Sequence, residues 1–415
     1  MDVATGSLGQ GLSVGVGMAL SARLDNLDFR TYVLLGDGEC AEGSVWEAVA
    51  LAGTQKLSNL VAIIDVNRLG QSQETSLGHD LEAYRRRFEA FNWRTEVIDG
   101  HDMEEILEVL AAAGLGNQPL VIIAKTFKGQ GISFTANKDA WHGKPLSNEE
   151  AERAIAELQP NAASASGIQI PAPQNLPAPN TTAPASYPAL AYKLGDKIAT
   201  REAYGAALTR IGDVDSRIVA MDGDTKNSTF SEKFAKKFPN RFTECFIAEQ
   251  NLVGVAVGFG ALQKIPFAST FAAFFTRAHD QIRMAGVSMS NLNLVGSHVG
   301  VSIGEDGPSQ MALEDIGMMR AIPGSVVLYP SDAVSTEKLV EQMIKTPGIC
   351  FLRTSRPKTP VIYNNDEQFP LGGAKVLKQG NSDKITIVTA GVTVFEALKA
   401  AETLAAEGIG VTVID

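Results

Sequence analysis

The chain has 415 residues, a formal net charge of −11 at pH 7 and 45% hydrophobic residues, which favours two or three globular domains. The acidic charge argues against nucleic-acid binding, which needs a basic surface. No apolar run approaches the ~18 residues of a membrane span, and nothing at the start resembles a signal peptide. Three cysteines, Cys40, Cys245 and Cys350, are too scattered for a disulfide framework or a zinc site. We therefore expect a cytoplasmic protein without membrane or nucleic-acid partners.

In the first part of the chain, apolar β-rich runs alternate with helical patterns. The β-rich runs are 31–35 (TYVLL), 60–66 (LVAIIDV) and 119–126 (PLVIIAKT), and the helical patterns are 43–55 and 103–114. Continuous apolar strands alternating with helices predict an α/β domain with a parallel sheet and helices on both faces.

Residues 160–192 are rich in Pro, Ala, Ser, Asn and Thr and carry almost no charge, which predicts an extended linker. The α/β pattern resumes beyond it and predicts a second parallel-sheet domain. Its strand-like runs are 217–224 (RIVAMDGD), 244–250 (ECFIAEQ), 291–298 (NLNLVGSH) and 325–332 (SVVLYPSD).

A proline-rich stretch at 357–370 precedes a final strand–helix–strand pattern, with strands at 384–391 and 410–415 and a helix at 394–408. A single βαβ unit leaves both sheet edges open, so we expect the start of an incomplete third α/β domain. The predicted organisation is a first domain at 1–159, the linker 160–192, a second domain at 193–360 and the third from 361 to 415. Because no strand precedes the glycine-rich loop at the start, we also expect the first domain to be incomplete at its N-terminus.

An acidic turn, GDGE at 36–39, closes the first strand. Asp37 lies in this turn, and Asn67 follows the next apolar strand 30 residues later. Ligands of open α/β sheets bind at the carboxyl ends of strands, and carboxylate, amide and carbonyl oxygens suit Mg²⁺ or Ca²⁺. Gly36 and Gly38 would let the backbone approach a diphosphate. Taken alone, GDGE is also compatible with a plain strand-to-helix turn.

GDGE followed by DVNRLGQS resembles the thiamine-diphosphate motif, and the surrounding sequence resembles transketolase in its animal branch. The similarity covers essentially the whole chain and includes ATGSLGQG, AKTFKGQGI, WHGKPL, GDTKNSTFSEKF, FIAEQN, STFAAFFTRA, GVSIGEDGPSQMALED and RTSRP. The resemblance implies a diphosphate- and metal-binding domain, a pyrimidine-binding domain and part of a C-terminal domain.

The resemblance also implies thiamine diphosphate and a divalent metal, Mg²⁺ or alternatively Ca²⁺ or Mn²⁺. The implied metal ligands are Asp37, Asn67 and the carbonyl of Leu69. The implied cofactor-binding residues are Gly6, Ser7, Leu8, Gly38, Asn67, Lys128, His142, Glu249, Phe271, Phe274 and Gln310. Gln310 and Arg277 depart from many microbial relatives, which carry histidine and, in some, a third aromatic residue at these positions. We interpret both as markers of the animal branch.

Glu249 is predicted to end the strand-like run ECFIAE, although a lone glutamate there would also be a plausible cap of a helix. In the family, a glutamate in this setting hydrogen-bonds the aminopyrimidine ring and starts the removal of the thiazolium proton, which requires a carboxyl group partly protonated near neutral pH. The resemblance assigns catalytic roles to Glu249 and His142. It assigns substrate binding to His142, Arg201, Ser228, His298, Asp306 and Arg356.

The predicted activity is transfer of a two-carbon ketol unit from a ketose phosphate to an aldose phosphate in the pentose phosphate pathway, by a homodimer whose active site lies at the subunit interface. One alternative is an impaired fragment or isoform that acts as a binding partner of full-length subunits, because the family's upstream catalytic residues are missing. A nicotinamide dehydrogenase is a further alternative. It is disfavoured because no strand precedes the glycine loop at 6–11 and no acid completes a dinucleotide-binding pattern.

Overall fold

The computed structural model describes residues 3–158 and 182–415. The chain forms two compact units, residues 8–178 (the first unit) and residues 1–7 with 179–415 (the second unit). Most of the predicted linker, 160–181, lies outside the described residues, and residues 182–192 contain no helix or strand.

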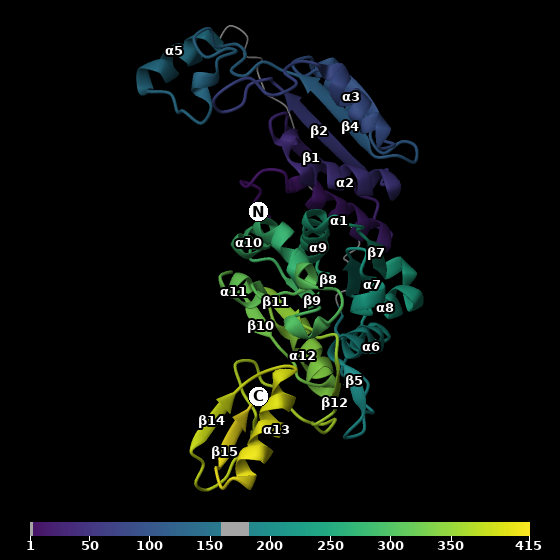
Figure 1. The fold of residues 1–415 in the computed structure, drawn as a ribbon. Helices are drawn as coiled ribbons and strands as arrows, with labels where there is room; N and C mark the ends of the chain where they lie inside the picture. The colour runs from purple at the N-terminus through teal and green to yellow at the C-terminus, as the bar shows by residue number, and fades with distance from the viewer. Residues whose placement is uncertain (1–2, 159–181) are drawn as a thin grey trace. The chain divides into compact units, whose positions relative to one another are not determined.

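The first unit is built on a four-stranded parallel sheet with the order β1-β2-β4-β3 (Figure 1). Its strands are β1 (Thr31–Gly36), β2 (Leu60–Val66), β3 (Arg94–Asp99) and β4 (Leu120–Lys125). Its helices are α1 (Gly11–Leu24), α2 (Gly43–Thr54), α3 (Leu81–Ala90), α4 (Met103–Ala111) and α5 (Asn148–Leu158). The parallel sheet, the three predicted strands and the two predicted helices are confirmed. The sequence interpretation did not include β3.

Side-chain caps fix where two of these helices begin. The Asp80 carboxylate accepts a hydrogen bond from the Ala83 N–H at the start of α3, and Asp102 accepts from Glu104 and Glu105 at the start of α4. Helix α4 packs against β3 and contributes Ile106 to an apolar cluster on the sheet. The carboxyl ends of β1 and β2 are therefore on a sheet supported by buried apolar contacts.

The second unit contains a six-stranded parallel sheet with the order β10-β11-β9-β8-β6-β7. Its strands are β6 (Ile218–Asp222), β7 (Phe242–Glu244), β8 (Ile265–Phe271), β9 (Leu292–Ser297), β10 (Val326–Leu328) and β11 (Ile349–Arg353). Its helices are α6 (Thr200–Gly212), α7 (Lys226–Thr229), α8 (Glu232–Lys237), α9 (Glu249–Ala261), α10 (His279–Val287), α11 (Asp315–Arg320) and α12 (Ala333–Lys345). Helix α9 packs on β8, and α6 packs on α12. Strands β5 (Lys197–Ala199) and β12 (Lys358–Pro360) form a separate antiparallel pair.

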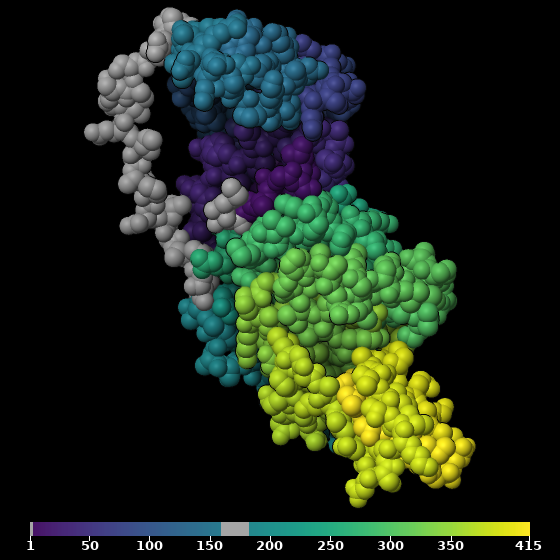
Figure 2. Space-filling view, turned by 90° about the vertical axis from the view of Figure 1, so that its left-hand side faces the viewer, coloured from purple at the N-terminus to yellow at the C-terminus, as the bar shows by residue number. Residues whose placement is uncertain are grey.

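The C-terminal residues, whose surface is yellow in Figure 2, form a small mixed sheet with the order β13-β15-β14. The predicted strand–helix–strand pattern is present as β14 (Ile385–Val388), α13 (Thr393–Ala406) and β15 (Val411–Ile414). A third strand, β13 (Val376–Lys378), pairs antiparallel with β15. We expected a lone βαβ unit with both sheet edges open. This expectation is wrong in one respect, because β13 pairs with β15 and covers one of these edges.

The strand predicted to end at Glu249 is also wrong. Strand β7 ends at Glu244, and Glu249 is the first residue of α9. Phe246 has a φ of 61°, outside the extended region that regular strand residues adopt, and the apolar side chains that suggested a strand are exposed, 50% for Phe246 and 70% for Ile247.

Candidate cofactor and substrate site

Asp37 is buried at the carboxyl end of β1 and is held by three hydrogen bonds. Its carboxylate accepts from the N–H of Gly38 at 2.8 Å, from the N–H of Arg68 at 2.6 Å and from the Thr75 hydroxyl at 3.2 Å. Strands β1 and β2 pair directly, and Arg68 follows Asn67 at the end of β2. The Asp37 carboxylate therefore joins the loops that follow the two strands.

Asn67 and Lys128 both hydrogen-bond Leu69, in the loop that follows β2. The Asn67 Oδ1 accepts from the Leu69 N–H at 3.0 Å, and its Nδ2 donates to Asp65 at 3.1 Å. The Lys128 Nζ donates to the Leu69 carbonyl at 3.4 Å and lies 2.7 Å from the His142 Nδ1. Four predicted site residues, Asn67, Leu69, Lys128 and His142, are thus linked by short contacts.

A hard divalent cation takes oxygen donors of the kind found at this edge. In the described part of the chain, no group of three or more His, Cys, Asp and Glu side chains could hold a metal ion. A cation here would take the buried carboxylate of Asp37 together with neutral amide or carbonyl oxygens. That donor set suits Mg²⁺ or Ca²⁺, which complete their coordination with water and phosphate oxygens. Asn67 and Leu69 remain candidate ligands.

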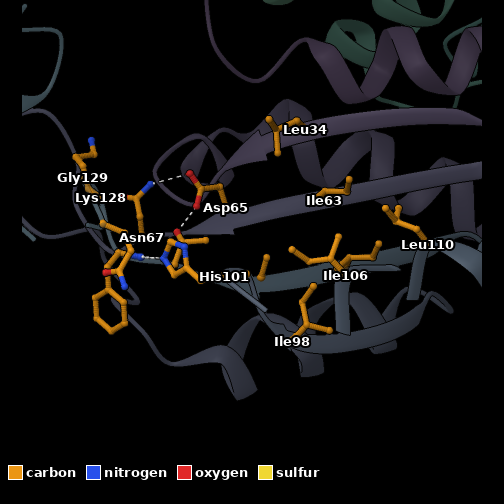
Figure 3. A pocket seen from close by; sticks show the side chains of 16 residues that line it. Leu34, Ile63, Asp65, Asn67, Ile98, His101, Ile106, Leu110, Lys128 and Gly129 are labelled. Atoms are coloured by element: carbon orange, nitrogen blue, oxygen red, sulfur yellow. Dashed lines mark hydrogen bonds between the residues drawn. The ribbon is translucent and has the colours of Figure 1, made fainter. Parts of the chain in front are cut away.

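Two cavities open at this end of the sheet. The larger one, about 750 Å³, has an apolar part formed by residues such as Leu34 and Ile63 and a polar end that contains Asn67, Asp65 and Lys128 (Figure 3). The smaller one, about 210 Å³, is lined by Asp37, Gly38 and residues of the 70–76 loop. Asp37 and Asn67 therefore line different cavities, although the N–H of Arg68, the residue after Asn67, donates to the Asp37 carboxylate.

Glu39 is a site residue that the sequence interpretation missed. Its carboxylate accepts from the N–H of Gly9 at 2.7 Å and from the N–H of Gly36 at 3.1 Å. Gly9 has a φ of 88°, and a Cβ there would lie 2.7 Å from the Cβ of Glu42, so a side chain is excluded. The glycine loop that includes the exposed Leu8 is thereby tied to the acidic turn. The sequence feature that could have indicated Glu39 is its place as the second acid of GDGE, three residues after Gly36.

Asp65 and Thr126 were also missed. The Asp65 carboxylate at the polar end of the larger cavity accepts hydrogen bonds from Asn67 and from the Thr126 hydroxyl. An acid inside the apolar run LVAIIDV was the signal that could have indicated it. Gly6 and Ser7 belong to the second unit, where the Ser7 hydroxyl donates to Asp280.

In the second unit, Glu249 lies at one end of a series of side-chain contacts. Its side chain is 3% exposed, and its Oε1 accepts from Nη1 of Arg277 at 2.8 Å. The Arg277 guanidinium lies 4.9 Å from the ring centroid of Phe274, which stacks on Phe271 at 5.3 Å. Phe271 stacks in turn on His298, with 3.9 Å between the ring centroids. The predicted residues Glu249, Phe274, Phe271 and His298 are thus connected through Arg277.

His298 begins a polar cluster. Its Nε2 lies 3.8 Å from the Asp306 carboxylate, which accepts from Nη1 of Arg356 at 2.8 Å. Burial lowers the pKa of His298 to about 4; the charges of Arg201 and Arg356 also lower it and Asp306 opposes them. The imidazole is therefore neutral at pH 7 and hydrogen-bonds the Ser297 hydroxyl through Nδ1 at 2.5 Å.

Two arginines contribute positive charge to this cluster. Arg201 donates to the Ser228 carbonyl at 2.9 Å, and burial lowers the pKa of Arg201, with the charge of Arg356 acting in the same direction. Arg356 also pairs with Glu305. Gln310 is exposed in the turn η7 (Pro308–Gln310), accepts from the Ser309 hydroxyl, and has no direct contact with Glu249 among the described hydrogen bonds. Two arginines beside hydroxyl and imidazole groups suit a phosphate-bearing ligand.

Comparison with known proteins identifies the family. The transketolase thiamine diphosphate binding domain matches residues 1–171, the pyrimidine binding domain matches 196–361, and the C-terminal domain matches 372–415. The chain is 55% identical to human transketolase over 417 residues, which cover 100% of this chain and 67% of the human protein. The chain belongs to the transketolase family.

Other relatives agree with this family assignment. Mouse transketolase-like protein 2 is 53% identical over 422 residues, again covering 100% of this chain and 67% of the relative. The crystal structure of transketolase from Campylobacter jejuni superposes with a TM-score of 0.86 at 25% identity and covers 100% of this chain and 71% of that one. The resemblance to transketolase is thus confirmed, and with it the thiamine-diphosphate-binding type of the first domain. No helix among residues 3–158 and 182–415 is long and apolar enough to cross a membrane.

Proposed function

We propose that the chain acts in the thiamine-diphosphate-dependent transfer of a two-carbon ketol unit from a ketose phosphate, such as xylulose 5-phosphate, to an aldose phosphate, such as ribose 5-phosphate. This is the sugar-phosphate interconversion of the pentose phosphate pathway. The observation that carries the proposal is a continuous set of contacts within the second unit. They run from a buried acid, Glu249, through the aromatic pair Phe274 and Phe271, to a histidine–arginine cluster suited to phosphate.

Bound thiamine diphosphate would supply the nucleophilic carbon and the electron sink that this reaction needs. Glu249 is buried where its carboxyl group could hydrogen-bond the aminopyrimidine ring, and Phe274 offers a flat apolar surface beside it. Arg201 and Arg356 would bind the sugar phosphate, and neutral His298 would offer a polar contact without adding charge. Asp306 could accept hydrogen bonds from sugar hydroxyls.

In the first unit, Asp37, Asn67 and the Leu69 carbonyl would hold a Mg²⁺ ion, with Ca²⁺ or Mn²⁺ as alternatives. Gly6, Ser7, Leu8, Gly38 and Gln310 remain proposed cofactor contacts. We also propose a homodimer in which the first unit of one chain works with the second unit of its partner, because the transketolase family is generally dimeric. The buried Glu249 lies in the second unit and the proposed metal ligands lie in the first, which is consistent with that arrangement.

The test is turnover together with cofactor binding. The purified chain, supplied with Mg²⁺ and thiamine diphosphate, would be given xylulose 5-phosphate and ribose 5-phosphate, and sedoheptulose 7-phosphate would be measured. Glu249→Gln keeps the size of the side chain but cannot be ionised, and we expect roughly 10²- to 10⁴-fold less product from this variant. Product formation that is equal in the wild type and in Glu249→Gln would contradict the proposal, as would a wild type that does not bind thiamine diphosphate.

A further inference from the structure

The guanidinium of Arg277 makes two contacts at once. Its Nη1 donates to Glu249 at 2.8 Å, and its Cζ lies 4.9 Å from the ring centroid of Phe274. The Glu249 side chain is 3% exposed, whereas that of Arg277 is 52% exposed. The carboxylate is therefore fixed in the protein interior, and the guanidinium reaches it from the surface.

An aminopyrimidine would need the same two partners. The proposed function, on which this inference rests, has its ring hydrogen-bonded to Glu249 and packed against Phe274. A guanidinium is planar, carries N–H donors on its edge and stacks on aromatic faces, so it can pair with the carboxyl group and lie on the phenyl ring that the cofactor ring would use. Arg277 thus already occupies both partners of the cofactor ring.

We propose that Arg277 is a placeholder for the aminopyrimidine. It is a positioning residue that neutralises Glu249 and covers Phe274 while no cofactor is bound, and it moves off both groups when the cofactor ring enters. The side chain is long and half-exposed within its own chain, so its own unit does not hold it on all sides. The aromatic support persists when the guanidinium leaves, because Phe271 stacks on Phe274 and is itself stacked on His298.

The pair also has an energetic consequence. A buried carboxylate without a partner is costly, so Arg277 stabilises the cofactor-free site. The cofactor must then displace this partner, which lowers its apparent affinity. Removing the guanidinium should therefore strengthen cofactor binding, which is the opposite of what loss of an ordinary binding residue would do.

The test compares two ligands on three proteins. Arg277→Met keeps an unbranched side chain and removes the charge, and Arg85→Met removes an exposed arginine that pairs with Glu82 and Glu89 on α3. Calorimetric titrations at fixed Mg²⁺ would use thiamine diphosphate and thiazole diphosphate, which lacks the aminopyrimidine ring. We expect Arg277→Met to bind thiamine diphosphate about tenfold more tightly, with unchanged affinity for thiazole diphosphate. Arg85→Met should match the wild type for both ligands.

Two results would overturn the proposal: thiamine diphosphate binding that is weaker or unchanged in Arg277→Met, or an equal gain for thiazole diphosphate. If the wild type binds neither ligand, the proposed function fails, and a cofactor-free measurement then decides whether Arg277 holds Glu249. Urea midpoints of Arg277→Met, Glu249→Gln and the double variant should be non-additive, with the second substitution shifting the midpoint less than it does alone. Additive shifts of the urea midpoint would mean that Arg277 and Glu249 do not interact, and the placeholder role of Arg277 would then be excluded.

Discussion

The Lys128 ammonium lies 2.7 Å from Nδ1 of His142 and 3.4 Å from the carbonyl oxygen of Leu69. An ammonium carries three donors and no acceptor, so Nδ1 must accept the hydrogen bond. The proton of the neutral imidazole is then on Nε2. One lysine thus sets the tautomer of a proposed catalytic histidine and contacts a proposed metal ligand.

Replacing Lys128 by Met should remove the preference of His142 for this tautomer. We expect the two ring ¹⁵N shifts of His142 to move toward each other, because neither nitrogen then has a fixed partner, and product formation to fall about tenfold. NMR of ¹⁵N-histidine-labelled protein measures the first effect, and the sugar-phosphate assay measures the second. Lys138→Met is the matched control, since the Lys138 ammonium donates to the Phe134 carbonyl at the surface. Unchanged ring shifts in Lys128→Met would contradict the assignment.

Asp37→Asn should abolish binding of the metal ion and, with it, binding of the cofactor. The amide is close in size to the carboxylate, but it brings an NH₂ group toward the donors of Gly38 and Arg68 and removes the negative charge. We expect about 1–3 kcal/mol of lost stability from the mismatched hydrogen bonds. Thermal unfolding with and without Mg²⁺ and thiamine diphosphate should show a ligand-induced rise in melting temperature for the wild type and none for the variant.

The control for this experiment is Asp28→Asn, which changes an exposed carboxylate in the same unit. It should keep the ligand-induced rise. If Asp37→Asn showed the wild-type rise as well, Asp37 would not be a metal ligand.

The sheets could be predicted from the sequence because their strands are continuous apolar runs. Residues such as Leu60 and Leu120 are buried on strands paired on both sides, so the pattern and the burial agree. The shorter run 245–248, which includes Phe246 and Ile247, is also apolar, but it leaves the sheet through a positive φ and exposes both side chains. Composition does not encode that backbone turn, so the strand was predicted to run to Glu249, and the alternative of a helix start at this residue is the one that the structure has.

Motif spacing identified the candidate site residues, but the interactions that join them were not predictable. Arg277 contacts Glu249 because η5 (Ala272–Ala278) winds as a 3₁₀ helix after β8. A 3₁₀ helix has three residues per turn, so Phe271, Phe274 and Arg277 share one face. In an α-helix, the same three-residue spacing would be typical of ordinary core packing. The Arg277–Glu249 ion pair therefore depends on the type of helix in η5 and on a contact between residues 28 positions apart in the chain. A single sequence shows neither.

Arg201→Gln should weaken binding of phosphorylated substrates selectively. Because the phosphate is bound both in the ground state and in the transition state, the KM for xylulose 5-phosphate should rise roughly 10- to 100-fold with little change in kcat. The same variant should use unphosphorylated xylulose as well as the wild type does. The chain offers a matched control in Lys233→Gln, since the cations of Arg201 and Lys233 both lie 5.3 Å from the Phe230 ring. A fall in kcat with both sugars would show that Arg201 shapes the site instead of binding phosphate.

His298 should make the stability of the second unit depend on pH. Burial lowers its pKa from the usual 6.5 to about 4, so between these values the unfolded chain binds a proton that the folded chain does not. The stability is complete above pH ~6.5 and is lost as the pH falls toward 4, by roughly 3 kcal/mol in total. His298→Asn keeps a polar group beside Ser297 and removes the titration, so its stability should change less over this range.

The measurement must follow the second unit by itself. All three tryptophans, Trp46, Trp93 and Trp141, lie in the first unit, so intrinsic tryptophan fluorescence would report the wrong transition. Native-state hydrogen exchange of peptides from β9 reports the unit that contains His298. We expect the protection of β9 to decline between pH 6.5 and 4.5 more steeply in the wild type than in His298→Asn. Parallel curves for the two proteins would mean that His298 titrates alike in the folded and unfolded chains, and its neutral role in the phosphate cluster would have to be abandoned.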